Sequence, residues 1–206
     1  MENLFAQIGL ALVVFVSTNI DDILLLTAFF SDPKLRVKAV VTGQYLGIGS
    51  LVVVSVITAV LALSIPPSLL ALLGILPIAL GCYKLYELYK NKQIESEENE
   101  NELKNDINAS EHRAAKNFGS QALGVASVTL ANGGDNLGIY IPIFTAHSHA
   151  LVVFVIVFAV MTAVWCVLGY VIVNNRVLGT TIRKYGHKIL PFVLILLGLD
   201  ILLDAF

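Results

Sequence analysis

Six long apolar stretches are the feature that most limits how this chain can fold. A helix needs about 20 mostly apolar residues to cross a bilayer. Only 14% of the residues are charged, against roughly a quarter in a soluble domain, and the stretches leave no room for a soluble catalytic domain. We therefore predict an all-α polytopic membrane protein, not an enzyme, with six transmembrane helices at residues 4–30, 37–63, 69–89, 118–146, 150–173 and 188–206.

The positive charges predict how these helices are oriented. All 13 Lys and Arg residues lie in or beside the first, third and fifth connections, whereas the turns 64–68 and 147–150 carry none. Basic connections are retained on the cytoplasmic side of a membrane. This distribution places both termini outside.

The long connection 91–117 divides the chain into two three-helix halves, residues 1–90 and 118–206. Its acidic, Asn-rich composition cannot bury enough apolar surface to fold alone, so we predict a disordered cytoplasmic linker. Because three is an odd number, the second half enters the membrane in the opposite orientation to the first.

Two short motifs that occur in both halves of the sequence support such an inverted repeat. An Asn-x-x-Asp motif at 19–22 recurs at 132–135, and Ile-Leu-Pro at 75–77 recurs at 189–191. The two separations are 113 and 114 residues, so they nearly agree on one register. Two inverted three-helix repeats with polar groups at mid-membrane are typical of secondary transporters.

Acidic residues inside the predicted spans point to a function. An ionisable group near the bilayer centre costs at least about 2.5–3.5 kcal/mol, so Asp22 and Asp135 are not expected there without a partner or a water path. Residues three apart share a helix face, which predicts Asn19 beside Asp22 and Asn132 beside Asp135. Thr18, one turn before Asp22, could add a hydroxyl.

The fourth predicted span should be broken near its middle. Residues 132–136 read Asn-Gly-Gly-Asp-Asn, which is turn chemistry, and Pro142 follows. By inverted symmetry the first span should be disturbed at 19–22, and the two Asn-x-x-Asp motifs should face one another. Asp21 points about 100° away from Asp22 and could join it only if the helix is broken.

Carboxylates, amides and freed main-chain carbonyls together would form an oxygen-rich cage. Such a cage suits hard divalent cations, and no Lys or Arg is present at mid-membrane to receive an anion. The alternative is that these polar groups only hold helices together by hydrogen bonds. No phosphate-binding Gly-rich loop occurs, so ATP is not expected to drive transport within this chain. We predict proton antiport, with Asp22 and Asp135 releasing protons when metal binds.

Four motifs give the chain a resemblance to a known family. The segments STNIDD at 17–22, GQYLG at 43–47, ILPIALG at 75–81 and NGGDNLGIYIP at 132–142 resemble the CadD-type cadmium-resistance transporters of the LysE superfamily of small exporters. The resemblance implies export of Cd²⁺, with Zn²⁺ as a second substrate, across a bacterial plasma membrane. It implies that the metal is held by Asn19, Asp21, Asp22, Asn132, Asp135 and Asn136.

Further polar residues are candidates for the transport path, each with a simpler reading. The amide of Gln44 could be a ligand or serve packing, and the histidines of the 147–149 turn could release metal or merely be exposed. The motif Gly43-x-x-x-Gly47 could serve a dimer interface or packing within one chain. The candidate path residues are Thr18, Gln44, Tyr45, His147, His149 and Asp200.

Other functions remain open from the residues alone. Mn²⁺ would fit an oxygen cage equally well, and Cys82 or Cys166 could add a sulfur ligand, although a buried thiol more often packs as a small hydrophobe. An amino-acid exporter is disfavoured, because adjacent acids would repel the substrate carboxylate. A scaffold would tolerate loss of the acids. We expect no bound cofactor and no nucleic acid partner, only metal, protons, lipid and a possible second copy of the chain.

Overall fold

The computed structural model describes residues 4–62, 64, 75–90, 117–173, 192, 195–197, 199 and 202–203, and the regular elements within these ranges are all helical. The predicted all-α class is confirmed for this part of the chain. Most of the last predicted span, nearly all of the 91–117 linker and the path candidate Asp200 lie outside the described residues. The elements are α1 (Leu4–Thr18), α2 (Ile20–Ser31), α3 (Val37–Ala62), α5 (Ile75–Lys90), α7 (Phe118–Asn132), α8 (Leu137–Ala146), the short 3-10 helix η2 (Ser148–Ala150) and α9 (Leu151–Val173).

Two of the described helical stretches are long and apolar enough to cross a membrane, namely 37–62 and 148–173. A third is obtained if α1 and α2, which meet at an angle of 58°, count as one bent span. Large apolar side chains point outward at helical spacing along these elements, for example Val53 and Ile57 of α3 and Ile156 and Val160 of α9. Apolar faces of this extent are typical of lipid contact. The protein is therefore a membrane protein, while the six spans and the external termini stay predictions.

Both predicted helix breaks are present. Helix α1 ends at Thr18 and α2 begins at Ile20, so the first apolar segment bends at Asn19. Helix α7 ends at Asn132, residues 133–136 form a turn, and α8 begins at Leu137. Two consecutive glycines weaken the helix at the second break, since glycine has the largest backbone entropy to lose on ordering.

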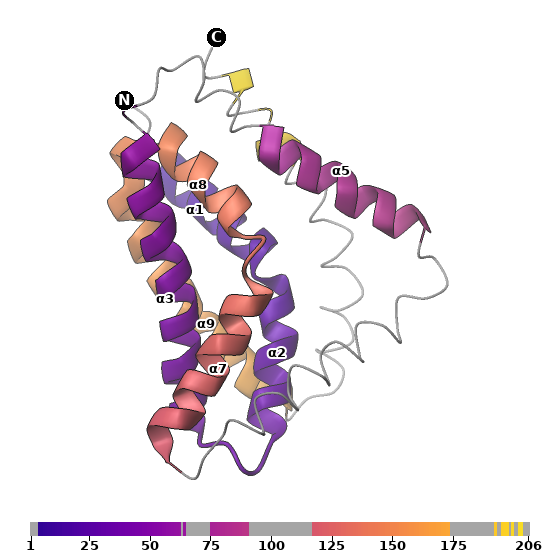
Figure 1. The fold of residues 1–206 in the computed structure, drawn as a ribbon, viewed down its shortest axis with the longest axis vertical. Coiled ribbons are helices and arrows are strands. Elements are labelled where there is room, and N and C mark those ends of the chain that lie inside the picture. Colours follow the sequence, from indigo (N-terminus) through magenta and orange to yellow (C-terminus); the bar gives the residue numbers. More distant parts are fainter. Residues whose placement is uncertain are drawn as a thin grey trace.

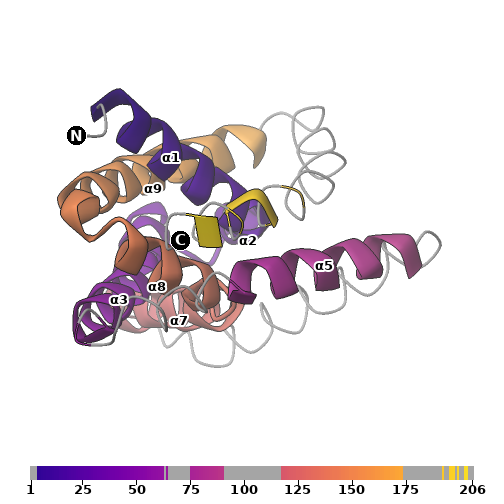
Figure 2. The same cartoon turned by 90° about the horizontal axis from the view of Figure 1, so that it is seen from above.

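The broken helices pack across the two halves of the chain (Figure 1). Helix α3 of the first half lies along α7 and α8 of the second, and α9 of the second half lies along α1 and α2 of the first. Figure 2 shows α1 beside α9 and α3 beside α7 and α8, with α5 extending away from them. This reciprocal exchange of partners is expected for an inverted repeat. The repeat itself and the division into 1–90, 91–117 and 118–206 remain predictions.

Glycines allow the closest of these helix contacts. A Cβ atom on Gly43 would lie 2.5 Å from Cβ of Val125, and one on Gly47 would lie 2.6 Å from Cβ of Thr129. The backbone of α3 therefore approaches α7 to a distance that no larger residue permits. Of the two predicted uses of the Gly43-x-x-x-Gly47 motif, packing within one chain is the one observed.

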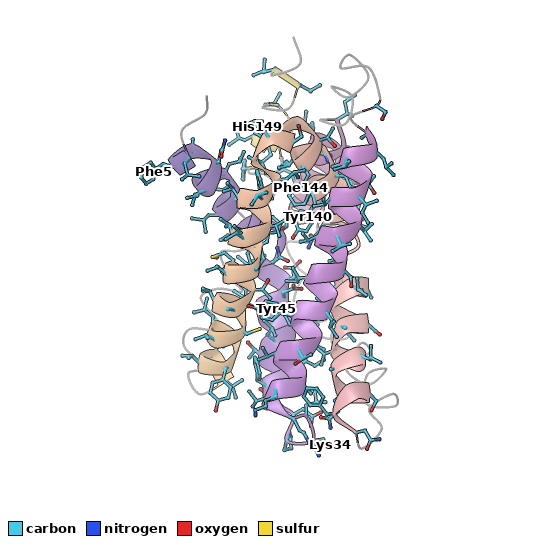
Figure 3. The ribbon with its side chains drawn as sticks, turned by 90° about the vertical axis from the view of Figure 1, so that its left-hand side faces the viewer. Phe5, Lys34, Tyr45, Tyr140, Phe144 and His149 are labelled. Atoms are coloured by element: carbon cyan, nitrogen blue, oxygen red, sulfur yellow. The ribbon has the colours of Figure 1, made fainter. Side chains whose placement is uncertain are left out.

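The two ends of the bundle carry different loops. Figure 3 shows Lys34, in the connection between α2 and α3, at one end and His149 at the other, with Tyr45 and Tyr140 between them. The basic connection and the histidine turn thus lie at opposite ends of the bundle. Both helix breaks lie between these ends, which places their polar side chains within the apolar part of the bundle.

Candidate functional site

Asp22 lies in the first turn of α2, directly after the first helix break, and is 2% exposed. Its Oδ2 accepts a hydrogen bond from Nε2 of Gln44 at 2.8 Å, and its Oδ1 accepts one from Nδ2 of Asn132 at 3.0 Å. Gln44 belongs to α3 and Asn132 ends α7. The two halves of the chain thus meet on one buried carboxylate, as predicted for facing Asn-x-x-Asp motifs.

Thr129 extends this network and was not among the predicted residues. Its hydroxyl donates to Oε1 of Gln44 at 2.8 Å, and the side chain is fully buried. Thr129 lies three residues before Asn132 and therefore on the same face of α7. That spacing was the available signal for Thr129, but it could not show that Gln44 would lie opposite. We call Asp22, Gln44, Thr129 and Asn132 the carboxylate cluster.

A second polar cluster lies at the first break. Nδ2 of Asn19 is 2.7 Å from the Tyr140 hydroxyl and 2.8 Å from Oγ1 of Thr18, and the two hydroxyls are 3.1 Å apart. We predicted that Asn19 would lie beside Asp22. That prediction is wrong for the side-chain nitrogen of Asn19, which bonds to Thr18 and Tyr140. The bend at Asn19 interrupts the helix, so the three-residue spacing no longer aligns the two side chains. Asn19 Oδ1 is buried and accepts no hydrogen bond from the described residues.

Side chains near the first break also donate hydrogen bonds to main-chain carbonyls. Ser17 and Thr18 donate to main-chain oxygens of the preceding turn, and the Trp165 indole donates from α9 to the carbonyl of Asn19 at 2.6 Å. Neither Trp165 nor Tyr140 was assigned a role from the sequence. Trp165 is the single tryptophan of the chain and lies in an apolar span, where its N–H needs a partner.

The other predicted ligands lie around Asp22 without sharing its burial. Asp21 is partly buried, Asp135 is exposed in the 133–136 turn, and Asn136 is buried at the start of α8. Asp22 is close enough to Asp21 and Asp135 to interact with their charges. Within the described ranges no group of three or more His, Cys, Asp or Glu side chains is placed to hold a metal ion. We predicted a cage of two or three carboxylates. The described residues contain one buried carboxylate, Asp22, with Asp21 and Asp135 near it.

Comparison with known proteins decides the family. The model of the cadmium resistance transporter family matches residues 15–205, nearly the whole chain and both helix breaks. The chain belongs to this family. No curated protein and no solved structure matches it. The resemblance to CadD-type transporters is therefore confirmed, and membership indicates a metal-resistance transporter.

The remaining path candidates of this transporter are dispersed. The Tyr45 hydroxyl donates to the carbonyl of Ala159 at 2.9 Å, so Tyr45 links α3 to α9 at the surface and not to Asp22. The expectation of an exposed turn holds for His149 but is wrong for His147, whose ring is 4% exposed and packs against Phe154. The chain turns back through η2 directly after His147. Cys166 is buried in α9, as predicted for a packed thiol, whereas the same expectation is wrong for Cys82, which is exposed.

Proposed function

We propose that this transporter is a secondary active exporter of divalent metal cations that moves Cd²⁺, with Zn²⁺ as a second substrate, out of the bacterial cytoplasm across the plasma membrane. The observation that carries the proposal is the Asp22 carboxylate, buried at a helix break and held by both halves of the chain. Export of a divalent ion from this position would confer cadmium resistance.

The charge of the site favours a cation. Both hydrogen-bond donors to Asp22 are neutral amides, those of Gln44 and Asn132. Removing a charge from water is costly unless an opposite charge compensates for it. A bound cation supplies that compensation. The same argument disfavours an amino-acid exporter, since the substrate carboxylate would be repelled by Asp22 and by the nearby Asp21 and Asp135.

Helix ends of both signs meet at the site. Helices α1 and α7 end there with partially negative C-termini, while α2 and α8 begin there with partially positive N-termini, which favour the ionised form of Asp22. Broken helices that point C-terminal ends at a cation are a recurring device of secondary transporters. The unused Oδ1 of Asn19 is a buried hard oxygen of the kind that divalent ions bind. We propose Asn19, Asp21, Asp22, Asn132, Asp135 and Asn136 as the residues from which the metal ligands are drawn.

Proton antiport is the proposed source of energy. Moving two positive charges out against 100 mV costs about 4.6 kcal/mol, at about 2.3 kcal/mol per charge. Protonation of both Asp22 and Asp135 would add the same charge to the site as one divalent cation. Exchange of two protons for one metal ion therefore avoids the electrical cost altogether.

The test is metal uptake into everted membrane vesicles whose interior is more acidic than the medium. We compare the unaltered chain with Asp22→Asn and Asp135→Asn, and use Asp32→Asn as the control. Asp32 lies beyond α2 in the connection to α3, where its Oδ1 accepts from the main chain of Lys34. Both site variants should lose saturable Cd²⁺ uptake and Asp32→Asn should keep it. Equal uptake by all three variants would overturn the proposal and leave the acids a structural role.

A further inference from the structure

The Gln44 side chain faces Asp22 with the wrong atom for metal binding. Its Nε2 donates to Oδ2 of Asp22, while its Oε1 accepts from Thr129. An N–H group cannot coordinate a cation. We infer that the Gln44 amide turns over by 180° when the ion binds, so that Oε1 becomes a ligand, and that the Thr129 hydroxyl is the positioning group that makes this reversal possible. The inference rests on the proposed cation site at Asp22.

Because Gln44 is buried, its amide needs a hydrogen-bond partner within the protein both before and after the reversal. Gln44 is 0% exposed, so no bulk water reaches the amide to replace a lost hydrogen bond. A buried polar group without a partner costs about as much as the hydrogen bond it has lost. Asn132 differs, because its side chain is exposed and is not enclosed by the helices. Of the two amides that now donate to Asp22, only Gln44 therefore needs an internal partner in both orientations.

A hydroxyl provides that partner because it can both donate and accept. In the described state the Thr129 hydroxyl donates to Oε1 of Gln44. After the reversal it would accept from Nε2 and donate to the carbonyl four residues earlier in α7. Other hydroxyls of this chain already make that bond, including Ser127 to Leu123 and Thr162 to Phe158, both at 2.8 Å. No buried polar atom is then left unpaired in either state.

Thr129 also has a packing role that the experiment must separate. A Cβ on Gly47 would lie 2.6 Å from both Cβ and Cγ2 of Thr129, so the Thr129 methyl fills the contact between α3 and α7. Thr129→Val removes the hydroxyl and keeps the branched shape. Thr129→Ser keeps the hydroxyl and removes the methyl. Ser127→Ala deletes an exposed hydroxyl two residues away on the same helix.

The experiment measures Cd²⁺ binding to the purified full chain by titration calorimetry, without transport. Thr129→Val should weaken binding about tenfold, which corresponds to one buried hydrogen bond. Thr129→Ser should stay within about threefold of the unaltered chain, as for loss of packing alone, and Ser127→Ala should bind as tightly. In a Gln44→Glu background both terminal atoms are oxygens and no reversal is needed, so Thr129→Val should have little effect there.

The inference is overturned if folded Thr129→Val binds Cd²⁺ normally, or if its loss is equally large in the Gln44→Glu background. Thermal unfolding without metal checks folding, and Thr129→Ala replaces Thr129→Val if the latter does not fold. Asp22→Asn separates the two proposals. If Asp22→Asn abolishes binding while Thr129→Val leaves it unchanged, the inferred reversal of Gln44 is rejected and the proposed cation site at Asp22 is retained. Normal binding by Asp22→Asn removes the site and the reversal together.

Discussion

Nδ2 of Asn132 donates to Oδ1 of Asp22 at 3.0 Å, although 110 residues separate them in the chain. Asn132 is the last residue of α7 and Asp22 lies in the first turn of α2. The bond therefore joins the C-terminal end of one half-helix to the N-terminal end of another. Any movement that separates α2 from α7 would have to break this bond.

Loss of the Asn132 amide should impair transport more than folding. Asn132→Ala removes a donor from the Asp22 carboxylate and a proposed ligand, and we expect at least a tenfold fall in Cd²⁺ uptake by vesicles. The buried Oδ1 of Asp22 also loses its donor, so the thermal midpoint should fall, but the chain should still fold. Asn117→Ala, an exposed asparagine at the start of α7 whose side chain forms no capping bond, is the control. Uptake equal to that control would exclude Asn132 from the site.

Loss of the Trp165 indole N–H should destabilise the first helix break. Trp165→Phe removes the indole hydrogen bond to the Asn19 carbonyl, and one such bond contributes about 0.5–1.5 kcal/mol to stability. Circular dichroism during denaturant unfolding in detergent measures the change. Tyr45→Phe, which deletes a surface hydroxyl bonded to Ala159, should cost clearly less. A Trp165→Phe protein as stable as Tyr45→Phe would show that water can replace the indole at this break.

The Tyr140 hydroxyl should contribute to metal affinity through Asn19. Tyr140→Phe keeps the ring packed on Phe158, at a centroid distance of 5.0 Å, but deletes the group that fixes Asn19 and Thr18. We expect Cd²⁺ to bind about tenfold more weakly, as for one lost hydrogen bond. In an Asn19→Ala background the same change should have almost no further effect. Additive losses would mean that Tyr140 does not act through Asn19.

The glycines of α3 provide a matched test of packing. A Cβ on Gly43 would lie 2.6 Å from the Ala122 carbonyl oxygen, whereas one on Gly49 would meet nothing within 4 Å. Gly43→Ala should therefore lower stability by about 1–3 kcal/mol through overpacking. Gly49→Ala should be neutral or slightly stabilising, because alanine is the better helix former. Thermal unfolding compares the two, and equal midpoints would contradict the observed approach of α3 to α7.

Transport driven by two protons per metal ion should respond to pH and not to voltage. In everted vesicles an acidic interior favours protons leaving in exchange for Cd²⁺ entering, so uptake should rise with that gradient and stop when nigericin dissipates it. A potassium diffusion potential set with valinomycin at constant pH should leave the rate unchanged. A rate that follows the potential instead would contradict an electroneutral exchange.

The helix breaks could be predicted because their cause is local. The glycine pair and flanking asparagines at 132–136 oppose a helix wherever they lie, and the apolar runs on each side require a membrane. Asp22 could be recognised for the same reason, since a carboxylate inside an apolar segment is costly in any fold. These inferences depend on neighbours along the chain, and the described residues agree with them.

The partners of Asp22 depend on contacts between distant segments. Gln44 and Thr129 meet only because glycines bring α3 against α7, a distance that no local pattern specifies. Asn19 turns to Tyr140 and not to Asp22, because a bend of 58° ends the helical spacing on which the prediction relied. A sequence reports the cost of placing a polar group in a membrane, but the group that offsets this cost is selected by how the helices pack.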